Sequence, residues 1–279
     1  MATKSETPTA SRRPNTPWEY RELIWNFTLR ELKARYKATA LGWTWSLLVP
    51  VATVVTYTVV FSLVFRAVPP DMGSGRSGVF AIWFICGLVP WTLLSGAITT
   101  GMPSLLAAGP MLQKIYIPSF VPVLGSVGAV VTQTLIEFGL VLAILALFGN
   151  IGWTWLLLPA WLALFVVFCA SCAYILAVAN VHLRDLAQIV AVTLQLMFFA
   201  TPILYSIDLI PETAGPIPLR ALVMANPVTE FVLGFRSLLY DLSPIPLAAV
   251  AYALSATAVA LLLAVLLSQR RGRTISEEL

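Results

Sequence analysis

Charged side chains are scarce in this sequence. Asp, Glu, Lys and Arg make up 11% of its 279 residues, whereas soluble domains contain about 25%. Hydrophobic residues make up 59%, and the mean hydropathy is +0.87. This composition excludes an ordinary soluble domain and predicts an integral membrane protein.

Nucleotide-binding and catalytic motifs are also missing. No GxxxxGK[ST] loop occurs, and none of the four lysines follows a glycine, so nothing in the sequence would cradle a phosphate. There is no nucleophile elbow and no HExxH motif. The only histidine, His182, falls in a short predicted loop, where it is more simply a solvated residue than a catalyst. We therefore predict that this chain is not an enzyme and hydrolyses no ATP by itself.

Cysteine is nearly absent, and its placement does not indicate a metal or redox site. Cys169 and Cys172 form a CxxC pair, but the pair lies inside a predicted span beside Ala and Ser residues. Small residues at such positions favour close helix packing. Cys86 is a single buried thiol, and we expect no metal in this chain.

Six apolar runs are long enough to cross a bilayer, which takes about 20 residues. They lie at residues 41–65, 79–99, 119–148, 154–180, 186–205 and 246–268. The sequence therefore predicts an all-α membrane protein with six transmembrane helices.

The distribution of lysine and arginine predicts the orientation, because cytoplasmic loops carry an excess of both. Thirteen of the 17 lie on the side that holds both termini. The other side has only Arg66, Arg76, Arg220 and Arg236. We therefore expect cytoplasmic termini, and we interpret the net charge of +4 as topology rather than nucleic-acid binding.

The chain divides into four predicted regions. Residues 1–16 are rich in Ser, Thr, Pro and Arg and predict a disordered cytoplasmic tail. An amphipathic cytoplasmic interface helix is expected over 17–39, the six-span domain over 40–268, and a second cytoplasmic tail over 269–279.

The interface helix carries apolar residues on two faces separated by polar strips. One stripe contains Trp18, Trp25, Leu29, Leu32 and Tyr36, and the opposite one contains Tyr20, Leu23, Ile24, Phe27 and Ala34. Such a helix can rest on lipid with one face and hold a protein partner with the other. The alternative is two short helices with a kink near Thr28.

The predicted external segment over 206–245 contains five prolines but is too apolar for a solvated loop. It predicts short re-entrant helices that dip into the outer leaflet. Irregular backbone is tolerated at that depth only where it packs on protein or lines a cavity.

Glu137 is the one ionisable residue at membrane depth. It follows Gln133 by four residues, so both point from the same helix face. A carboxylate there marks either an ion path or a hydrogen bond to a neighbouring helix. We favour a structural or pore-lining role over proton coupling, because the sequence offers no Arg, Lys or His partner on another span.

Five motifs in order resemble the ABC-2 permease subunits of polysaccharide exporters, along roughly residues 18–268. They are Arg30 to Pro50 with Arg35-Tyr36 and Gly42-Trp43, Lys114 to Pro118, Arg184-Asp185-Leu186, Thr201 to Tyr205, and Asn226-Pro227 with Arg236. The charged N-terminal helix and its tryptophan-rich end look closest to permeases that export the lipid-linked galactan of mycobacterial cell walls.

This resemblance implies a homodimer in the bacterial plasma membrane with a separate ABC ATPase subunit. The substrate would be a polyprenyl-phosphate-linked glycan such as O-antigen, teichoic acid or cell-wall galactan. ATP and Mg²⁺ would bind to the partner ATPase, and no cofactor is expected in this chain.

Coupling to the ATPase is expected on the cytoplasmic side. The loop over 100–118 predicts a short helix framed by Gly101, Pro103 and Gly109-Pro110. The expected contacts are Gly109, Pro110, Met111 and Lys114 in this loop, Arg30 and Glu31 in the interface helix, and Arg184 and Asp185. Asp185 could equally cap the fifth span.

A glycan needs a shielded tunnel, because each hydroxyl stripped of water without a partner costs about 2–7 kcal/mol. Aromatic faces pack on sugar C–H groups without trapping them. The candidate path consists of Tyr57, Phe61, Trp83, Phe84, Glu137, Phe198, Phe199 and Tyr205. For any one aromatic residue, core packing or lipid contact is an equally good interpretation.

Three other functions remain possible from the sequence. An ABC-2 exporter of a small lipid or drug would differ in pore width. A membrane-embedded transferase would need more acidic or histidine residues than Asp185 and His182 at the cytoplasmic face. A proton-coupled carrier would rest on Glu137 alone.

Overall fold

The computed structural model describes residues 20–36, 42–112, 117–183, 185–213, 215–216 and 218–271. Within these residues the chain is helical and has no strand. The longer helices are α1 (Arg21–Tyr36), α2 (Trp45–Thr58), α3 (Phe80–Ala107), α5 (Phe120–Leu147), α6 (Leu158–His182), α7 (Leu186–Ala200), α9 (Pro227–Leu239) and α10 (Leu247–Arg271). The shorter ones are η2 (Gly42–Thr44), η3 (Val59–Val64), α4 (Gly109–Leu112), η4 (Trp153–Leu157), η5 (Ile207–Leu209) and α8 (Leu219–Met224).

Five helices among the described residues are long and apolar enough to cross a membrane. They are Trp45–Val64, Phe80–Ala107, Phe120–Leu147, Trp153–His182 and Leu247–Arg270. The sixth predicted span corresponds to α7, a shorter apolar helix of 15 residues. At 1.5 Å per residue, α7 is about 22 Å long, less than the hydrocarbon thickness of about 30 Å. The all-α membrane fold is therefore confirmed. In the predicted span over 186–205, helix α7 ends at Ala200 and irregular backbone follows it.

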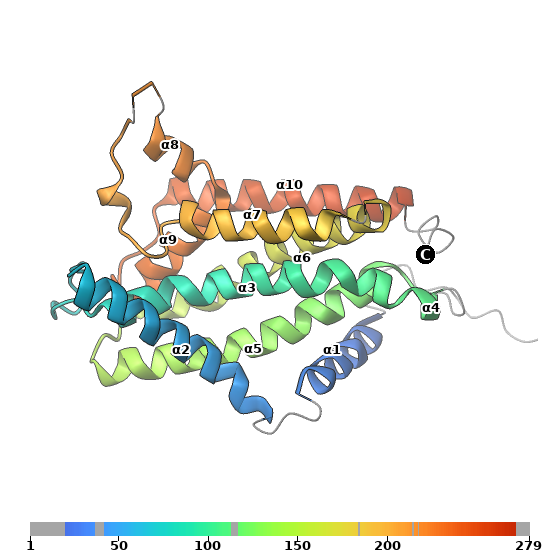
Figure 1. Cartoon of the computed structure of the whole chain (residues 1–279), viewed down its shortest axis with the longest axis horizontal. Helices are drawn as coiled ribbons and strands as arrows, with labels where there is room; N and C mark the ends of the chain where they lie inside the picture. The colour runs from blue at the N-terminus through green and yellow to red at the C-terminus, as the bar shows by residue number, and fades with distance from the viewer. Residues whose placement is uncertain are drawn as a thin grey trace, which may run out of the picture.

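Helices α3, α5, α6, α7 and α10 run along the long axis of the molecule (Figure 1). Helices α1 and α4 lie towards the end at which α10 finishes, and α8 lies at the opposite end. The segments predicted to be cytoplasmic thus share one end. Which end faces the cytoplasm stays a prediction from the basic residues.

Helix α3 forms the centre of the bundle and packs against α5, α6, α9, α2 and α7. In its most apolar 18-residue stretch, 78% of the residues are buried, whereas α2 buries only Ser46 and Pro50. Helix α3 also runs through Gly101 and Pro103 to Ala107. The prediction that Gly101 and Pro103 frame a separate short helix was therefore wrong, and only α4 is separate.

Helix α1 is continuous from Arg21 to Tyr36, so the alternative of a kink near Thr28 is not observed. It packs along α5. Tyr20, Leu23, Ile24 and Phe27 of one predicted stripe pack against the hydrophobic core, next to the buried Thr28. In the other stripe, Leu32 is buried but Trp25 is 57% exposed. One stripe therefore contacts protein as predicted, and lipid contact by the other stays a prediction.

Two further boundaries differ from the predictions. Helix α10 continues to Arg271, so the predicted tail over 269–279 begins inside a helix. His182 is the last residue of α6 rather than a loop residue, and its Nδ1 lies 3.0 Å from the carbonyl oxygen of Val178. Hydropathy falls at polar residues near the end of each helix, Asn180 in α6 and Gln269 in α10, although the helices themselves continue.

Candidate functional site

The aromatic residues predicted to form the path converge from separate elements. The ring of Tyr57 on α2 lies 5.1 Å from Phe84 on α3 and 6.0 Å from Phe198 on α7, centroid to centroid. Phe61 on η3 lies 6.2 Å from Tyr57. Aromatic pairs prefer offset or tilted packing at about 4.5–7 Å. These rings therefore form one cluster that joins α2, α3 and α7.

Sequence reasoning missed three members of this cluster, one of which is Phe65, whose ring lies 5.5 Å from Phe61. Phe80 stacks on Phe61 at 5.6 Å and on Phe84 at 5.9 Å. Trp91 lies 5.6 Å from Phe198. Phe80 precedes Phe84 by four residues and Trp91 follows it by seven, which is the spacing of one helix face. That periodicity was available in the sequence.

Burial divides the predicted path residues into two groups. The side chains of Trp83 and Phe84 are only 5% and 0% exposed, so they belong to the core of the single chain. Phe199 is 56% exposed, and Tyr57, Phe61 and Phe198 are half-buried. Only this second group can contact a substrate without rearrangement, and its role in transport stays a prediction.

Tyr205 lies where two cavities meet. One cavity of about 450 Å³ also contacts Phe199, and another of about 240 Å³ contacts Phe61 and Trp83. The Tyr205 hydroxyl donates a hydrogen bond of 2.8 Å to the carbonyl oxygen of Phe199. The irregular backbone after α7 is therefore bordered by two cavities.

Arg236 anchors that irregular backbone from α9. Its guanidinium nitrogens donate hydrogen bonds to the carbonyl oxygens of Pro202 and Ile203. Its Cζ lies 3.6 Å from the centroid of the Trp83 ring on α3. The last carbonyls of a helix lack partners within the helix, and Arg236 supplies donors just beyond the end of α7. The residue is 3% exposed, and a Cβ on Gly87 would lie 2.7 Å from its Nη2.

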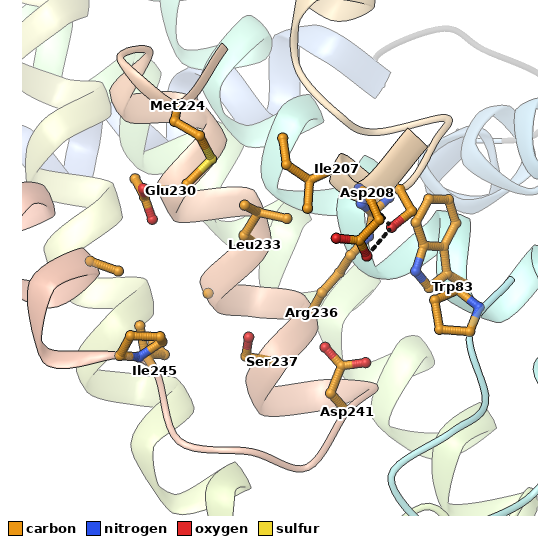
Figure 2. A pocket seen from close by; sticks show the side chains of 15 residues that line it. Trp83, Ile207, Asp208, Met224, Glu230, Leu233, Arg236, Ser237, Asp241 and Ile245 are labelled. Carbon is orange, nitrogen blue, oxygen red and sulfur yellow. Dashed lines mark hydrogen bonds between the residues drawn. The ribbon is translucent and has the colours of Figure 1, made fainter. Parts of the chain in front are cut away.

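Arg236 also borders a pocket of about 380 Å³ (Figure 2). Glu230 and Ser237 line it from α9, Asp241 lines it from just beyond the end of that helix, and Asp208 approaches it from η5. Desolvation raises the pKa of the Glu230 and Asp241 carboxyls, an effect that Arg236 partly offsets at Asp241. The pocket is thus rich in hydrogen-bond acceptors, and Asp208 already pairs with the exposed Arg220 at 3.2 Å.

Glu137 is buried between α5 and α3. Its Oε1 accepts a hydrogen bond of 3.0 Å from Gln133, which confirms that both residues share a helix face, and its Oε2 lies 3.1 Å from the Thr92 hydroxyl on α3. The Gln133 Oε1 accepts a hydrogen bond of 2.8 Å from Arg35. The expectation concerned basic partners of Glu137 on other spans, and α1 is not one of the predicted spans. Arg35 reaches Glu137 from α1 through Gln133.

The predicted ATPase contacts are only partly described. Gly109, Pro110 and Met111 form α4, and Arg30 is exposed while Glu31 is half-buried on α1. Both helices lie at the same end of the molecule (Figure 1). Lys114 and Arg184 lie outside the described residues.

Asp185 stands at the N-cap position of α7, but its side chain makes no capping hydrogen bond. The alternative that Asp185 caps this helix through its carboxylate is therefore wrong. Its carbonyl oxygen accepts hydrogen bonds from the backbone N–H groups of Gln188 and Ile189. Among the described residues, no group of three or more His, Cys, Asp and Glu side chains could hold a metal ion.

Comparison with known proteins gives consistent results. The model of the ABC-2 type transporter family matches residues 22–240. An O-antigen export system permease protein RfbA from Myxococcus xanthus is 31% identical over 251 residues, which cover 88% of this chain and 90% of the relative. A protein of the same name from Klebsiella pneumoniae is 29% identical over 220 residues, covering 78% and 80% of the two chains.

Proposed function

Because this chain belongs to the ABC-2 type transporter family, we propose that it is the permease subunit through which an ATP-driven exporter moves a lipid-linked polysaccharide out of the cytoplasm. The observation that carries this proposal is the 31% identity to an O-antigen export permease over 88% of the chain. The cargo would be a polyprenyl-phosphate-linked glycan, and the N-terminal helix favours cell-wall galactan. The membrane would be the bacterial plasma membrane, with both termini in the cytoplasm.

The short helix α7 supports a transport path. Beyond Ala200 the chain leaves helical geometry while still inside an apolar region of the sequence. Lipid offers no hydrogen-bond partners to such backbone, so it has to face protein or a water-filled cavity. The half-buried rings of Tyr57, Phe61 and Phe198 lie beside this segment and would form a smooth wall for a sliding glycan.

A second copy of the chain would complete this path. Helix α2 buries only Ser46 and Pro50, and α7 buries only Val190 and Leu194. Both helices flank α3 on the face that carries the aromatic cluster. A homodimer that joins these faces would enclose the irregular backbone between two copies, which lipid alone could not do.

Energy would come from a separate ABC ATPase that binds ATP and Mg²⁺. Its contacts would be Gly109, Pro110 and Met111 of α4, Arg30 and Glu31 of α1, and Lys114, Arg184 and Asp185. Helices α1 and α4 share one end of the molecule (Figure 1), so one partner could contact both.

A further argument comes from the acceptor-rich pocket, which lies at the end of the molecule away from α1 and α4 (Figure 1). This pocket favours the hydroxyl groups of a glycan. Glu230, Asp241 and Ser237 face it, and no hydrogen-bond donor from the described residues reaches the Glu230 or Asp241 carboxylates. Sugar hydroxyls can donate to such groups, so this pocket suits the glycan part of the cargo rather than its phosphate.

Reconstitution tests the proposal directly. The chain and its ATPase would be placed in vesicles with ATP outside, and protected lipid-linked glycan would be measured beside a fluorescent phospholipid and a hydrophobic dye. Glycan transport that requires ATP is the expected result. Transport of the phospholipid or dye without glycan would instead indicate the small-lipid or drug exporter. An ATPase variant that cannot hydrolyse ATP serves as the control.

A further inference from the structure

Helix α1 is held on α5 by contacts that only glycine permits. A Cβ on Gly125 would lie 2.4 Å from the Cβ of Phe27, and one on Gly128 would lie 2.6 Å from the Thr28 hydroxyl oxygen. Thr28 also donates a hydrogen bond of 3.1 Å to the carbonyl oxygen of Gly125. Because real Cβ atoms do not come this close, the glycines fix how α1 sits against α5.

A second contact lies two helical turns further along both helices. Arg35 follows Thr28 by seven residues, and Gln133 follows Gly125 by eight, which is about two turns in each case. Arg35 donates its 2.8 Å hydrogen bond to Gln133 at this point. Helix α1 therefore runs in the same direction as α5 and is attached to it at two levels.

From Gln133 the polar contacts continue into the centre of the bundle. Gln133 donates to Glu137 at 3.0 Å, and Glu137 lies 3.1 Å from the Thr92 hydroxyl on α3. The preceding residue of α3 is Trp91, whose ring contacts Phe198 of the aromatic cluster at 5.6 Å. Side-chain contacts thus join α1 to α3 through α5, and the backbone between Thr92 and Trp91 connects them to the aromatic cluster.

We propose that Arg35, Gln133, Glu137 and Thr92 form a relay that transmits the position of α1 to the aromatic cluster during the ATP-driven cycle. This inference rests on the proposed function, because it takes α1 to be a contact of the ATPase. The four are positioning residues that act through α3, not groups that touch substrate. A movement of α1 along α5 would break or shift the Arg35 hydrogen bond and so change the restraint on α3.

The geometry supports a relay rather than simple adhesion. Apolar packing would attach α1 to α5 without placing a carboxylate in the interior, where an ionised group is costly unless it is hydrogen-bonded. Glu137 is 3% exposed, and two of its contacts lead in opposite directions, towards α1 and towards α3. Discrete hydrogen bonds of this kind give two distinct arrangements, made or broken, as a switching element requires.

Matched variants separate this relay from general stability. Arg35→Gln and Lys33→Gln each remove one positive charge from α1, but Lys33 is exposed and lies outside the relay. Thr92→Val and Thr99→Val each remove a hydroxyl from α3, but the Thr99 hydroxyl bonds only to its own helix. Thr92→Ser keeps the hydroxyl and serves as the conservative variant.

The measurement is glycan transported per ATP hydrolysed by the complete complex in vesicles, together with its thermal unfolding temperature. We expect Arg35→Gln and Thr92→Val to lower this ratio about fivefold or more, while ATP hydrolysis continues. Lys33→Gln, Thr99→Val and Thr92→Ser should stay near the wild-type ratio. The Arg35→Gln/Thr92→Val double variant should be no worse than either single one, because the relay is already broken.

Two outcomes would overturn the relay. The ratio could stay at the level of the control variants, or the relay variants could lose ATP hydrolysis and transport equally as the complex becomes less stable. A wild-type complex that hydrolyses ATP but moves no glycan would instead contradict the proposed function, so the two failures are distinguishable.

Discussion

Arg236 shows how one side chain can support a broken membrane helix. It places a cation inside the protein, over the Trp83 ring and against two carbonyl groups that follow α7. Its planar guanidinium donates to the two carbonyls from two separate nitrogens while it lies over the Trp83 ring, whereas an ammonium group offers a single nitrogen. The irregular segment that borders the cavities therefore depends on a residue from α9.

Replacing Arg236 with methionine should strongly destabilise the protein. The carbonyls of Pro202 and Ile203 would lose their donors, at about 1–3 kcal/mol for each buried group left unpaired. Thermal unfolding in lipid nanodiscs would measure the loss, with Arg220→Met as the control. Arg220 forms an exposed ion pair with Asp208, and such pairs contribute about 0–1 kcal/mol. Equal unfolding temperatures for the two variants would refute the anchoring role.

For Glu137, the glutamine and leucine variants should behave differently. Glu137→Gln keeps the shape and can still bond to Gln133 and Thr92, so export should persist if the group is structural. Glu137→Leu would remove the acceptor that Gln133 bonds to, at about 1–3 kcal/mol, although Thr92 could still donate to the Val89 carbonyl. This variant should lower stability and transport per ATP. Vesicle transport assays decide the matter. Loss of export in the glutamine variant, with normal expression and ATP hydrolysis, would indicate proton transfer instead.

The Glu137 contacts also show what local sequence can reveal. The pairing with Gln133 could be predicted because four residues make one helical turn. Arg35 lies 98 residues away from Gln133 in the chain, so that contact depends on how α1 docks. The hydropathy of individual residues does not show which helix α1 packs against.

At the scale of elements, the α1–α5 contact should be sensitive to a single methyl group. Gly125→Ala would push its Cβ into Phe27, whereas Gly139→Ala on the same helix meets nothing within 4 Å. Alanine is otherwise favoured over glycine in a helix by about 1 kcal/mol. We therefore expect Gly139→Ala to be neutral or stabilising and Gly125→Ala to release α1. Protease cleavage within α1 would report the release, and equal cleavage of both variants would contradict this docking.

Helix α7 shows why element ends were harder to predict than element existence. Residues 201–205 are as apolar as those before them, so hydropathy extended the predicted span to Tyr205. The structure ends the helix at Ala200, because Pro202 disfavours helical geometry at the preceding residue. Conversely, Pro103 does not end α3, which continues to Ala107. Proline alone therefore does not determine a boundary, and packing in the bundle decides each case.

At the scale of the whole molecule, the number and alternation of apolar helices followed from hydropathy and charge. The relay and the acceptor-rich pocket did not, because each combines residues from separate elements. Glu230 and Ser237 lie on α9 and Asp241 just after it, yet only the fold places them beside Asp208 and Arg236. The exposed apolar faces of α2 and α7 also become visible only when the bundle is assembled.

Those faces lead to the last prediction, which concerns the homodimer. Leu196 on α7 and Val55 on α2 are 66% and 56% exposed, and Val259 on α10 is similar at 58%. If two copies join through α2 and α7, cysteines at Leu196 and Val55 should be linked between copies by a short thiol cross-linker in membranes. A cysteine at Val259 should react with a monofunctional reagent but not form dimers. Cross-linking that is equal at all three positions, or strongest on α10, would place the dimer contact elsewhere and leave the α2 and α7 faces to lipid.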